Sequence, residues 1–248
     1  MPNLSGKVAI VTGASKGIGA AIAEKLAEDG AAVVVNYSSS AREAEAVIAN
    51  IYRRGGRALA VRADMNKRAD IKKLFETTVR EFGHVHVLVN NAAIFRPAPL
   101  DKVDDQLFDQ HFNLNVKSLF FSIQEAVNLF GDAGGSIINI SSIAALSPRP
   151  NLVVYCATKA AVDAITKGLA AELGPRKVLV NSVLPGATDT EGFRAMPGSS
   201  DFRSIVASQA PLGRIGLPRD IANVVSFLAG DEAAWITGQL ISVSGGWS

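Results

Sequence analysis

The sequence predicts an α/β protein in which one doubly wound parallel sheet of about seven strands carries helices on both faces. Two observations support this fold class: short apolar runs without alternation, and segments of helical periodicity between them. Consecutive apolar positions are typical of strands that are buried on both faces of a parallel sheet. Regular exchange of strand and helix implies right-handed βαβ units.

Seven β-branched or apolar runs are expected to form the strands. In chain order they are Val8–Thr12, Ala32–Asn36, Ala58–Ala63, Val85–Asn90, Ser136–Ser141, Val178–Pro185 and Leu240–Gly246. Three segments between them place apolar residues on one helix face, at Ile18, Ile22 and Leu26, at Ile71, Leu74, Phe75 and Val79, and at Ile221, Val224, Val225 and Leu228. No linker or low-complexity tract interrupts this order, so residues 1–248 are expected to form a single domain.

The least regular stretch runs from Gly186 to Ser204 and contains glycines, a proline and several serines. A loop of that length inside a compact domain is usually either a functional lid or disordered. We therefore expect a mobile loop here, close to a substrate site.

Composition narrows the class of protein. With 25 basic and 23 acidic residues, the net charge of +2 does not indicate nucleic acid or an anionic membrane as a partner. The one cysteine, Cys156, cannot form a disulfide within the chain, which fits a reducing compartment. The N-terminus lacks a signal-peptide pattern, and no apolar stretch reaches the ~18 residues of a membrane span. We expect a cytoplasmic protein.

A glycine-rich turn follows the first expected strand. Gly13, Gly17 and Gly19 are spaced as GxxxGxG and open a strongly periodic helix. Glycines allow a tight turn, and they let backbone N–H groups approach a pyrophosphate at a helix N-terminus. An ordinary βα turn with positive φ would also use glycine. The strand–turn–helix context favours a dinucleotide site in a Rossmann-type sheet.

Several further motifs occur in a familiar order. They are "TGASKGIG" (Thr12–Gly19), "NNAA" (Asn90–Ala93), "NLNVKS" (Asn113–Ser118), "NISS" (Asn139–Ser142), "YCATK" (Tyr155–Lys159), "PG" (Pro185–Gly186) and "APLGRIGLPRDIA" (Ala210–Ala222). Together they resemble the short-chain dehydrogenase/reductase family over the whole chain. Within that family the chain looks most like 3-oxoacyl-[acyl-carrier-protein] reductases and related NADPH-dependent carbonyl reductases. One departure is Ser244, where the family often has Asp or Asn.

Tyr155 and Lys159 are one helical turn apart, so their side chains lie on the same face with Cβ atoms ~6 Å apart. On an isolated helix this could be two unrelated polar residues. An ammonium ~4–5 Å from the phenol would favour the phenolate by roughly 3–4 kcal/mol at an effective dielectric of ~20. That corresponds to ~2–3 pKa units, which would bring the pKa of Tyr155 near working pH. We therefore expect Tyr155 to transfer the proton and Lys159 to tune it.

The resemblance implies roles for the neighbouring polar residues. Ser142, thirteen residues before Tyr155, would donate a hydrogen bond to the substrate oxygen, and Lys159 would also bind the nicotinamide ribose. Asn115 would hold a water that links Lys159 to solvent. Local roles are the alternatives, a turn cap for Ser142 and helix packing for Asn115.

The end of the second strand predicts the cofactor. An NAD-preferring enzyme usually has an acid here, but this chain has Asn36, followed by Tyr37, Ser38 and Ser39. These hydroxyls, with Lys16 and Arg42, suit the 2′-phosphate of NADP(H). By resemblance, the remaining cofactor contacts are Gly13, Ser15, Gly17, Ile18 and Gly19 in the turn, Asp64 and Met65 at the adenine, Asn91 and Ala92 near the ribose, Pro185 and Gly186, and Thr188 and Thr190 at the carboxamide and phosphate.

The expected reaction is reduction of a ketone, 3-oxoacyl or similar, to a secondary alcohol with Tyr155 as general acid. Apolar candidates near the mouth are Ile94, Phe95, Leu146, Val153, Phe193, Met196 and Phe202. Sugar and polyol dehydrogenases share every motif and are the alternative, and a non-catalytic dinucleotide sensor is a different class.

The three histidines have no cysteine or acidic cluster at ligand spacing, so no metal site is expected. The resemblance implies a homo-oligomer, a tetramer rather than a dimer. It would form through the helix that carries Tyr155, the helix before it and the C-terminal strand.

Overall fold

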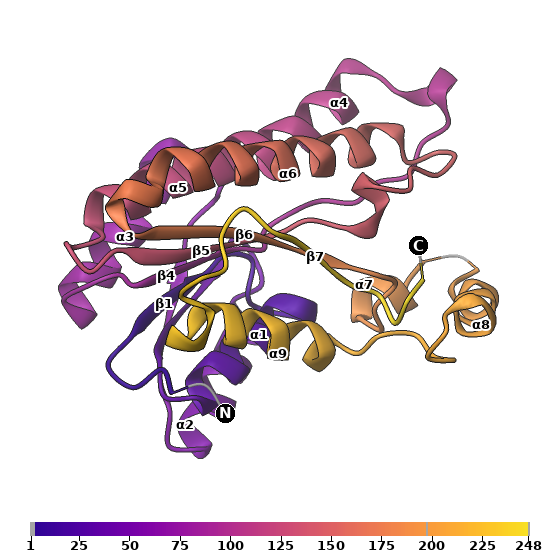
Figure 1. The fold of residues 1–248 in the computed structure, drawn as a ribbon. Coiled ribbons are helices and arrows are strands. Elements are labelled where there is room, and N and C mark those ends of the chain that lie inside the picture. Colours follow the sequence, from indigo (N-terminus) through magenta and orange to yellow (C-terminus); the bar gives the residue numbers. More distant parts are fainter. Residues whose placement is uncertain (1–2, 197, 248) are drawn as a thin grey trace.

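The structure is a computed structural model that describes residues 3–196 and 198–247. Its strands form one parallel sheet in the order β3-β2-β1-β4-β5-β6-β7, which confirms the predicted fold class (Figure 1). The strands are β1 (Val8–Val11), β2 (Ala32–Tyr37), β3 (Arg57–Arg62), β4 (Val87–Asn90), β5 (Gly135–Ile140), β6 (Val178–Pro185) and β7 (Leu240–Val243). β7 ends three residues earlier than predicted, because Gly245 and Gly246 turn the chain with φ values of 66° and 84°.

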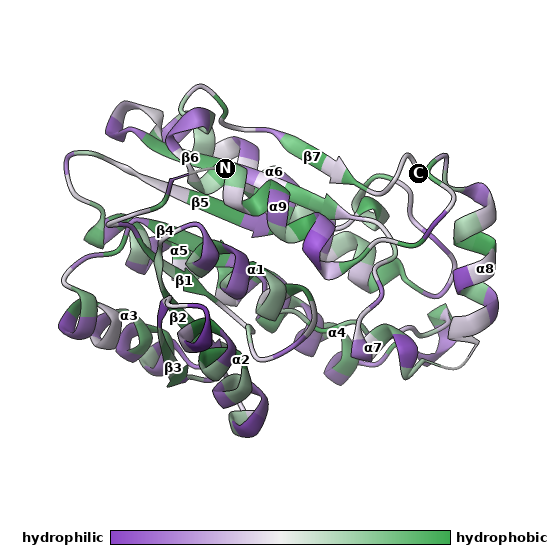
Figure 2. Ribbon diagram, turned by 90° about the horizontal axis from the view of Figure 1, so that it is seen from below, coloured by the Kyte–Doolittle hydropathy of each residue, from purple (hydrophilic) through white to green (hydrophobic). Residues whose placement is uncertain are grey.

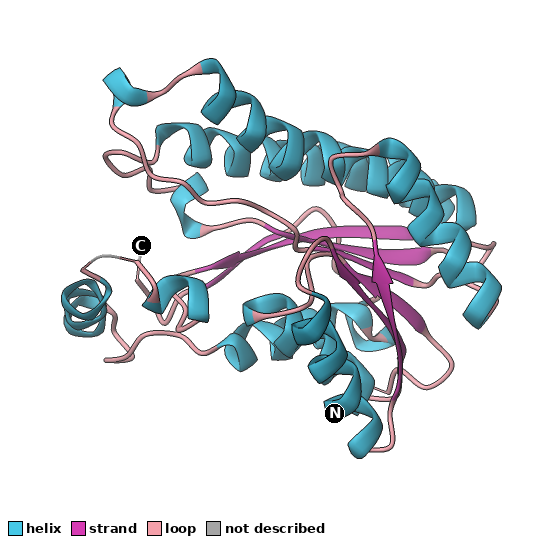
Figure 3. Cartoon of the chain, turned by 180° about the vertical axis from the view of Figure 1, so that it is seen from behind, coloured by secondary structure: helices cyan, strands magenta, loops and turns pink. Residues whose placement is uncertain are grey.

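Helices cover both faces of this sheet (Figure 3). One layer contains α1 (Gly17–Glu28), α2 (Ala41–Arg53) and α9 (Pro218–Ala229). The other contains α3 (Arg68–Phe82), α4 (Asp105–Phe112), α5 (Ser118–Leu129) and α6 (Val153–Leu173), with a π-helical turn at Asn113–Lys117 between α4 and α5. The two short helices α7 (Glu191–Arg194) and α8 (Ser199–Gln209) lie beyond the carboxyl ends of the strands (Figure 1).

Each face of the sheet has its own hydrophobic core. The first packs Ile22 and Leu26 of α1 and Val225 of α9 against the sheet, and the second packs Phe75 of α3 and Ile123 of α5 against the opposite face. The strands are largely hydrophobic in Figure 2, whereas hydrophilic residues gather on the outer sides of α2 and α3. Burial on both faces explains why the strands appear in the sequence as unbroken apolar runs.

The topology determines where a ligand can bind. β1 pairs with both β2 and β4, so the chain runs outward in one direction from β1 to β3 and in the other from β4 to β7. The loops after β1 and β4 therefore diverge at the carboxyl edge and leave a crevice between them, which is the usual ligand site in such sheets.

The prediction of an irregular loop over Gly186–Ser204 was wrong for most of that segment, since α7 and the start of α8 fall within it. Its polar residues cap helices: the Thr190 hydroxyl accepts a hydrogen bond from the Phe193 N–H at 3.1 Å, and Gly198, with φ of 70°, immediately precedes α8. Pro197 lies outside the described residues. The serines and glycines mark helix starts here.

Candidate active site

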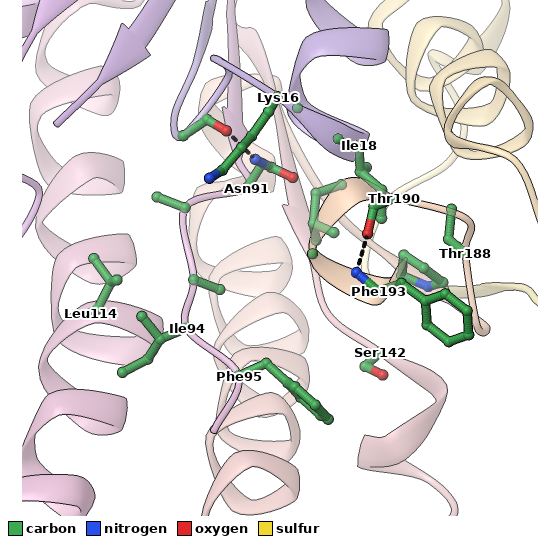
Figure 4. A pocket seen from close by; sticks show the side chains of 18 of the residues that line it. Lys16, Ile18, Asn91, Ile94, Phe95, Leu114, Ser142, Thr188, Thr190 and Phe193 are labelled. Atoms are coloured by element: carbon green, nitrogen blue, oxygen red, sulfur yellow. Dashed lines mark hydrogen bonds between the residues drawn. The ribbon is translucent and has the colours of Figure 1, made fainter. Parts of the chain in front are cut away.

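A cavity of about 810 Å³ opens at the carboxyl edge of the sheet. Its lining includes every predicted cofactor and catalytic residue except Asn115 and Arg42. Figure 4 shows Lys16, Ile18 and Asn91 at one end, Ser142 and Phe95 at the other, and Thr188, Thr190 and Phe193 along the side. The predicted residues therefore come together from separate parts of the chain.

The turn after β1 packs so tightly that glycine is required. A Cβ on Gly13 would lie 2.9 Å from the Ala92 Cα, and one on Gly19 would lie 2.5 Å from the Asn91 Nδ2. The Asn91 Nδ2 in turn donates to the carbonyls of Thr12 and Gly13, each at 2.9 Å. These contacts hold the turns after β1 and β4 together at the cavity.

The N-terminus of α1 faces this cavity. Gly17, Ile18 and Gly19 form the first turn and line it, and within the described residues no side chain caps the helix. Its first N–H groups and the positive end of the helix dipole can therefore bind an anion. Lys16, the residue before α1, adds a positive charge to the same end.

Asn36 binds neighbouring backbone groups through its side chain. Its side chain is buried, with the Oδ1 accepting from the Gly13 N–H at 3.1 Å and the Nδ2 donating to the Ala63 carbonyl at 3.0 Å. Asn36 thus links the glycine turn to the end of β3. The hydroxyl residues after it, Ser38 and Ser39, lie at the cavity beside Asp64. Sequence reasoning missed Ser40, Ala63 and Asn66, which also line this end.

Tyr155 projects from the first turns of α6 into the other end of the cavity. Burial raises the pKa of Tyr155 to about 12, while the neighbouring Ser142 hydroxyl acts in the opposite direction. The ring of Phe95 contacts the tyrosine edge-on, with centroids 4.9 Å apart. The Ser142 oxygen accepts from the Ala144 N–H at 3.1 Å, which leaves its own proton available to a ligand.

Lys159 does not tune Tyr155 in the way that the spacing predicted. Its ammonium nitrogen lies 5.6 Å from the centroid of the tyrosine ring and donates to the Ile140 carbonyl at 2.8 Å. Burial lowers the pKa of Lys159 to about 8, while the charge of Asp163 raises it. Burial is therefore the largest influence on both groups, since it raises the pKa of Tyr155 and lowers that of Lys159.

Asn115 stands behind the cavity wall, in the π-helical turn between α4 and α5. Its Oδ1 accepts from the Ile94 N–H at 2.8 Å, and its Nδ2 donates to the Ile94 carbonyl at 3.0 Å and to the Thr158 hydroxyl at 3.1 Å. Thr158 donates in turn to the Tyr155 carbonyl at 2.7 Å. The side chain of Asn115 therefore joins the loop after β4 to the helix that carries Tyr155.

Of the apolar candidates for the substrate end, five line the cavity: Ile94, Phe95, Phe193, Met196 and Phe202. Leu146 and Val153 do not line it, and each is 61% exposed. Sequence reasoning missed Arg149 and Trp247, which line the cavity although neither belongs to a recognisable motif.

Two other classes of site are absent from the described residues. No group of three histidine, cysteine, aspartate or glutamate side chains is arranged to hold a metal ion. None of the helices in the described ranges is both long and apolar enough to cross a membrane.

Known proteins resemble this chain over nearly its whole length. A family model described as enoyl-(acyl carrier protein) reductase matches residues 13–248. An uncharacterized oxidoreductase of Methylorubrum extorquens is 48% identical over 247 residues, covering 99% of each chain. A solved short-chain dehydrogenase/reductase of Serratia marcescens is 40% identical with a TM-score of 0.93, covering 99% of each chain.

A solved structure described as the angucycline C-6 ketoreductase LanV with bound NADP is 39% identical with a TM-score of 0.92, covering 99% of this chain and 96% of that one. The family model, the sequence identities and the structural similarity agree across these comparisons. The chain therefore belongs to the short-chain dehydrogenase/reductase family.

Proposed function

We propose that this protein is an NADP(H)-dependent oxidoreductase that reduces a ketone to a secondary alcohol. The observation that carries the proposal is one cavity with a glycine turn and a helix N-terminus at one end and Ser142, Tyr155 and Lys159 at the other. A dinucleotide needs the first end, and proton transfer to a carbonyl oxygen needs the second. A non-catalytic sensor would have no use for the second end.

The residues present fit an NADP(H) molecule. Gly17 and Ile18 present N–H groups of the first turn of α1 to the pyrophosphate, and Lys16, Ser38 and Ser39 supply a cation and hydroxyls for the 2′-phosphate. Asn36 brings no negative charge to this end, and its amide is engaged with backbone groups. When bound, the nicotinamide supplies a hydride to the carbonyl carbon.

Tyr155 and Ser142 are the groups that act on the substrate oxygen. Tyr155 keeps its proton at physiological pH, because its pKa is raised to about 12, and it donates that proton as the carbonyl oxygen gains negative charge. Ser142 donates a second hydrogen bond to the same oxygen. Lys159 supplies positive charge beside the phenol, which stabilises the phenolate left after the transfer. Asn115 positions this helix against the loop after β4.

The substrate end favours a ketone with an apolar body. Phe95, Phe193, Met196 and Phe202 line it, which suits a 3-oxoacyl or aryl ketone better than a sugar or polyol. We also propose that the segment from Gly186 to Ser204 closes over this substrate as a lid. Asp189 forms ion pairs with Arg194 of α7, at 2.8 Å, and Arg203 of α8, at 2.5 Å, so the segment can move as one unit.

We further propose a cytoplasmic homo-oligomer, a tetramer rather than a dimer. Large apolar side chains are exposed near the elements expected at the interfaces: Phe120 on α5, Val153 on α6 and Trp235 before β7. Light scattering at micromolar concentration tests this arrangement, and a stable monomer would overturn it.

The decisive assay follows NADPH oxidation with 3-oxoacyl esters, aryl ketones, activated diketones and sugars. Tyr155→Phe should lower kcat by at least ~10² while NADPH binding, measured by fluorescence, is retained. Cys156→Ala, at the adjacent buried position, controls for local packing. A Phe variant with near wild-type turnover would refute the role of Tyr155, and turnover of sugars alone would favour the alternative substrate class.

A further inference from the structure

At the substrate end of the cavity, a row of aromatic side chains from separate segments leads to the guanidinium of Arg149. Phe193 and Phe202 have ring centroids 6.0 Å apart, and Phe202 and Trp247 meet edge-on at 5.8 Å. The Arg149 guanidinium carbon lies 4.2 Å from the centroid of Trp247. Each spacing is within contact range for its kind. The wall therefore combines flat apolar surface with one positive charge.

Trp247 is a fixed platform for this charge. It is buried, and its indole N–H donates to the Gln209 side chain at 3.3 Å. Arg149 sits in the loop before α6 between Pro148 and Pro150, which restrict the backbone on both sides. Stacking uses the face of the guanidinium, so the N–H groups in its plane stay available for a planar anion.

Among the described residues, Arg149 forms no ion pair within 4.0 Å and no side-chain hydrogen bond. The other cations that line the cavity are engaged elsewhere: Lys16 stands at the glycine turn, and Lys159 donates to the Ile140 carbonyl. An arginine without an ion-pair partner among the described residues, in a mostly apolar chamber, is suited to bidentate recognition of a carboxylate.

We infer that Arg149 and Trp247 form an anion-recognition subsite, so that the substrate is a flat ketone with an anionic group at the end away from the carbonyl. This inference rests on the proposed ketone reduction and narrows its substrate class. The shared chemistry is a planar oxyanion, either a carboxylate or an ionised phenol. Stacking on the aromatic row orients the flat body, and the arginine selects the charge.

The kinetic test compares 4-acetylbenzoate with its neutral amide, 4-acetylbenzamide. Wild-type enzyme should show at least a tenfold higher kcat/KM for the acid, and Arg149→Gln should reduce that ratio to within about twofold of unity. Arg53→Gln, an exposed change of the same charge on α2, should leave the ratio unmoved. Equal use of acid and amide by the wild type, or an unchanged ratio in Arg149→Gln, would overturn the inference.

A second pair of substrates distinguishes a carboxylate from an ionised phenol. The ratio of kcat/KM for 4-hydroxyacetophenone to kcat/KM for 4-methoxyacetophenone is measured at one pH below and one pH above the pKa of the phenol. If the preference for the phenol rises on ionisation, the subsite accepts phenolates; a preference for the benzoate alone assigns it to carboxylates. In Arg149→Gln, whichever preference the wild type shows should be lost.

A binding measurement separates this inference from the proposed function. The chain has two tryptophans, and Trp235 is 99% exposed, so Trp235→Phe leaves Trp247 as the single fluorescent reporter at the subsite. Its quenching should give at least tenfold tighter binding of 4-acetylbenzoate than of the amide, and Arg149→Gln should abolish the difference. Anion-selective binding without turnover of any ketone would contradict only the proposed function. Turnover of ketones without anion selectivity would contradict only the subsite.

Discussion

Replacing Asp163 with asparagine should lower the pKa of Lys159 and so narrow the pH range of activity. Asp163 follows Lys159 by one turn of α6 and is buried, and its Oδ1 accepts from the Ser182 hydroxyl at 3.0 Å. Its Oδ2 has no hydrogen-bond partner among the described residues. A buried carboxylate that is satisfied at only one oxygen acts on its nearest cation mainly through its charge.

The size of this effect follows from the helix geometry. Side chains one turn apart have Cβ atoms roughly 6 Å apart, and two unit charges at that distance attract by about 2–3 kcal/mol at an effective dielectric of ~20. That corresponds to at most about two pKa units. Burial also raises the pKa of Asp163, which reduces its average charge, so we expect a shift of about one to two units. Ser141, Ser182 and Lys167 oppose that rise.

The assay is the pH dependence of kcat/KM for ketone reduction, which reports groups of the free enzyme. Activity should fall near pH 8 in the wild type, where Lys159 loses its charge, and about one to two units lower in Asp163→Asn. Glu172→Gln removes an exposed charge from the same helix and should leave the profile in place. If kcat/KM of Asp163→Asn falls on the alkaline side at a pH within ~0.3 units of the wild-type value, Asp163 does not determine the charge of Lys159.

Three other predictions concern the cofactor, the lid and the fold. Lys16→Ala should weaken NADPH binding more than NADH binding, and an equal loss for both would contradict a 2′-phosphate contact. Asp189→Asn should accelerate amide hydrogen exchange in residues 199–209, because it removes the ion pairs of Asp189. Those ion pairs lower the pKa of Asp189 to about 2, so the amides of the wild type should stay protected until the pH falls toward 2. Asp29→Asn should cost ~3–5 kcal/mol in urea unfolding, because it leaves the Lys25 ammonium buried and unpaired, whereas Glu28→Gln at an exposed pair should cost under ~1 kcal/mol.

The sheet could be predicted because its strands are buried on both faces. Such strands need apolar residues at consecutive positions, so β1 and β6 could be read directly from Val8–Val11 and Val178–Pro185. The glycine turn could be predicted for a similar reason, since close approach to Asn91 and Ala92 leaves no room for a Cβ. Burial on both faces and the lack of room for a Cβ each restrict the residue type at single positions or in short runs, so both can be recognised in the sequence.

The protonation of Tyr155 could not be predicted from spacing. The one-turn separation from Lys159 indicates an attraction between the two side chains, but it carries no information about how much protein surrounds them. Burial shifts the pKa values of Tyr155 and Lys159 to about 12 and about 8, which brings the two groups closer to being neutral together. That result depends on packing from β5, the loop after it and Phe95, which only the folded chain brings together.

The substrate end was the least predictable part for a related reason. Arg149, Phe202 and Trp247 are separated by 45 residues or more along the chain, and none belongs to a motif that fixes its neighbours. Phe202 reaches the cavity because α8 exists, and the Gly/Ser-rich composition of that segment had indicated an irregular loop. Trp247 reaches it because two glycines with positive φ turn the chain just after β7. The residues proposed to transfer the proton occupy motifs that the sequence displays. The residues proposed to select the substrate are brought together only by the loop before α6, by α8 and by the turn after β7. Substitutions at Arg149 or Trp247 should therefore change which ketone is reduced before they change how it is reduced, and kcat/KM ratios between substrates should detect this where a single-substrate assay would not.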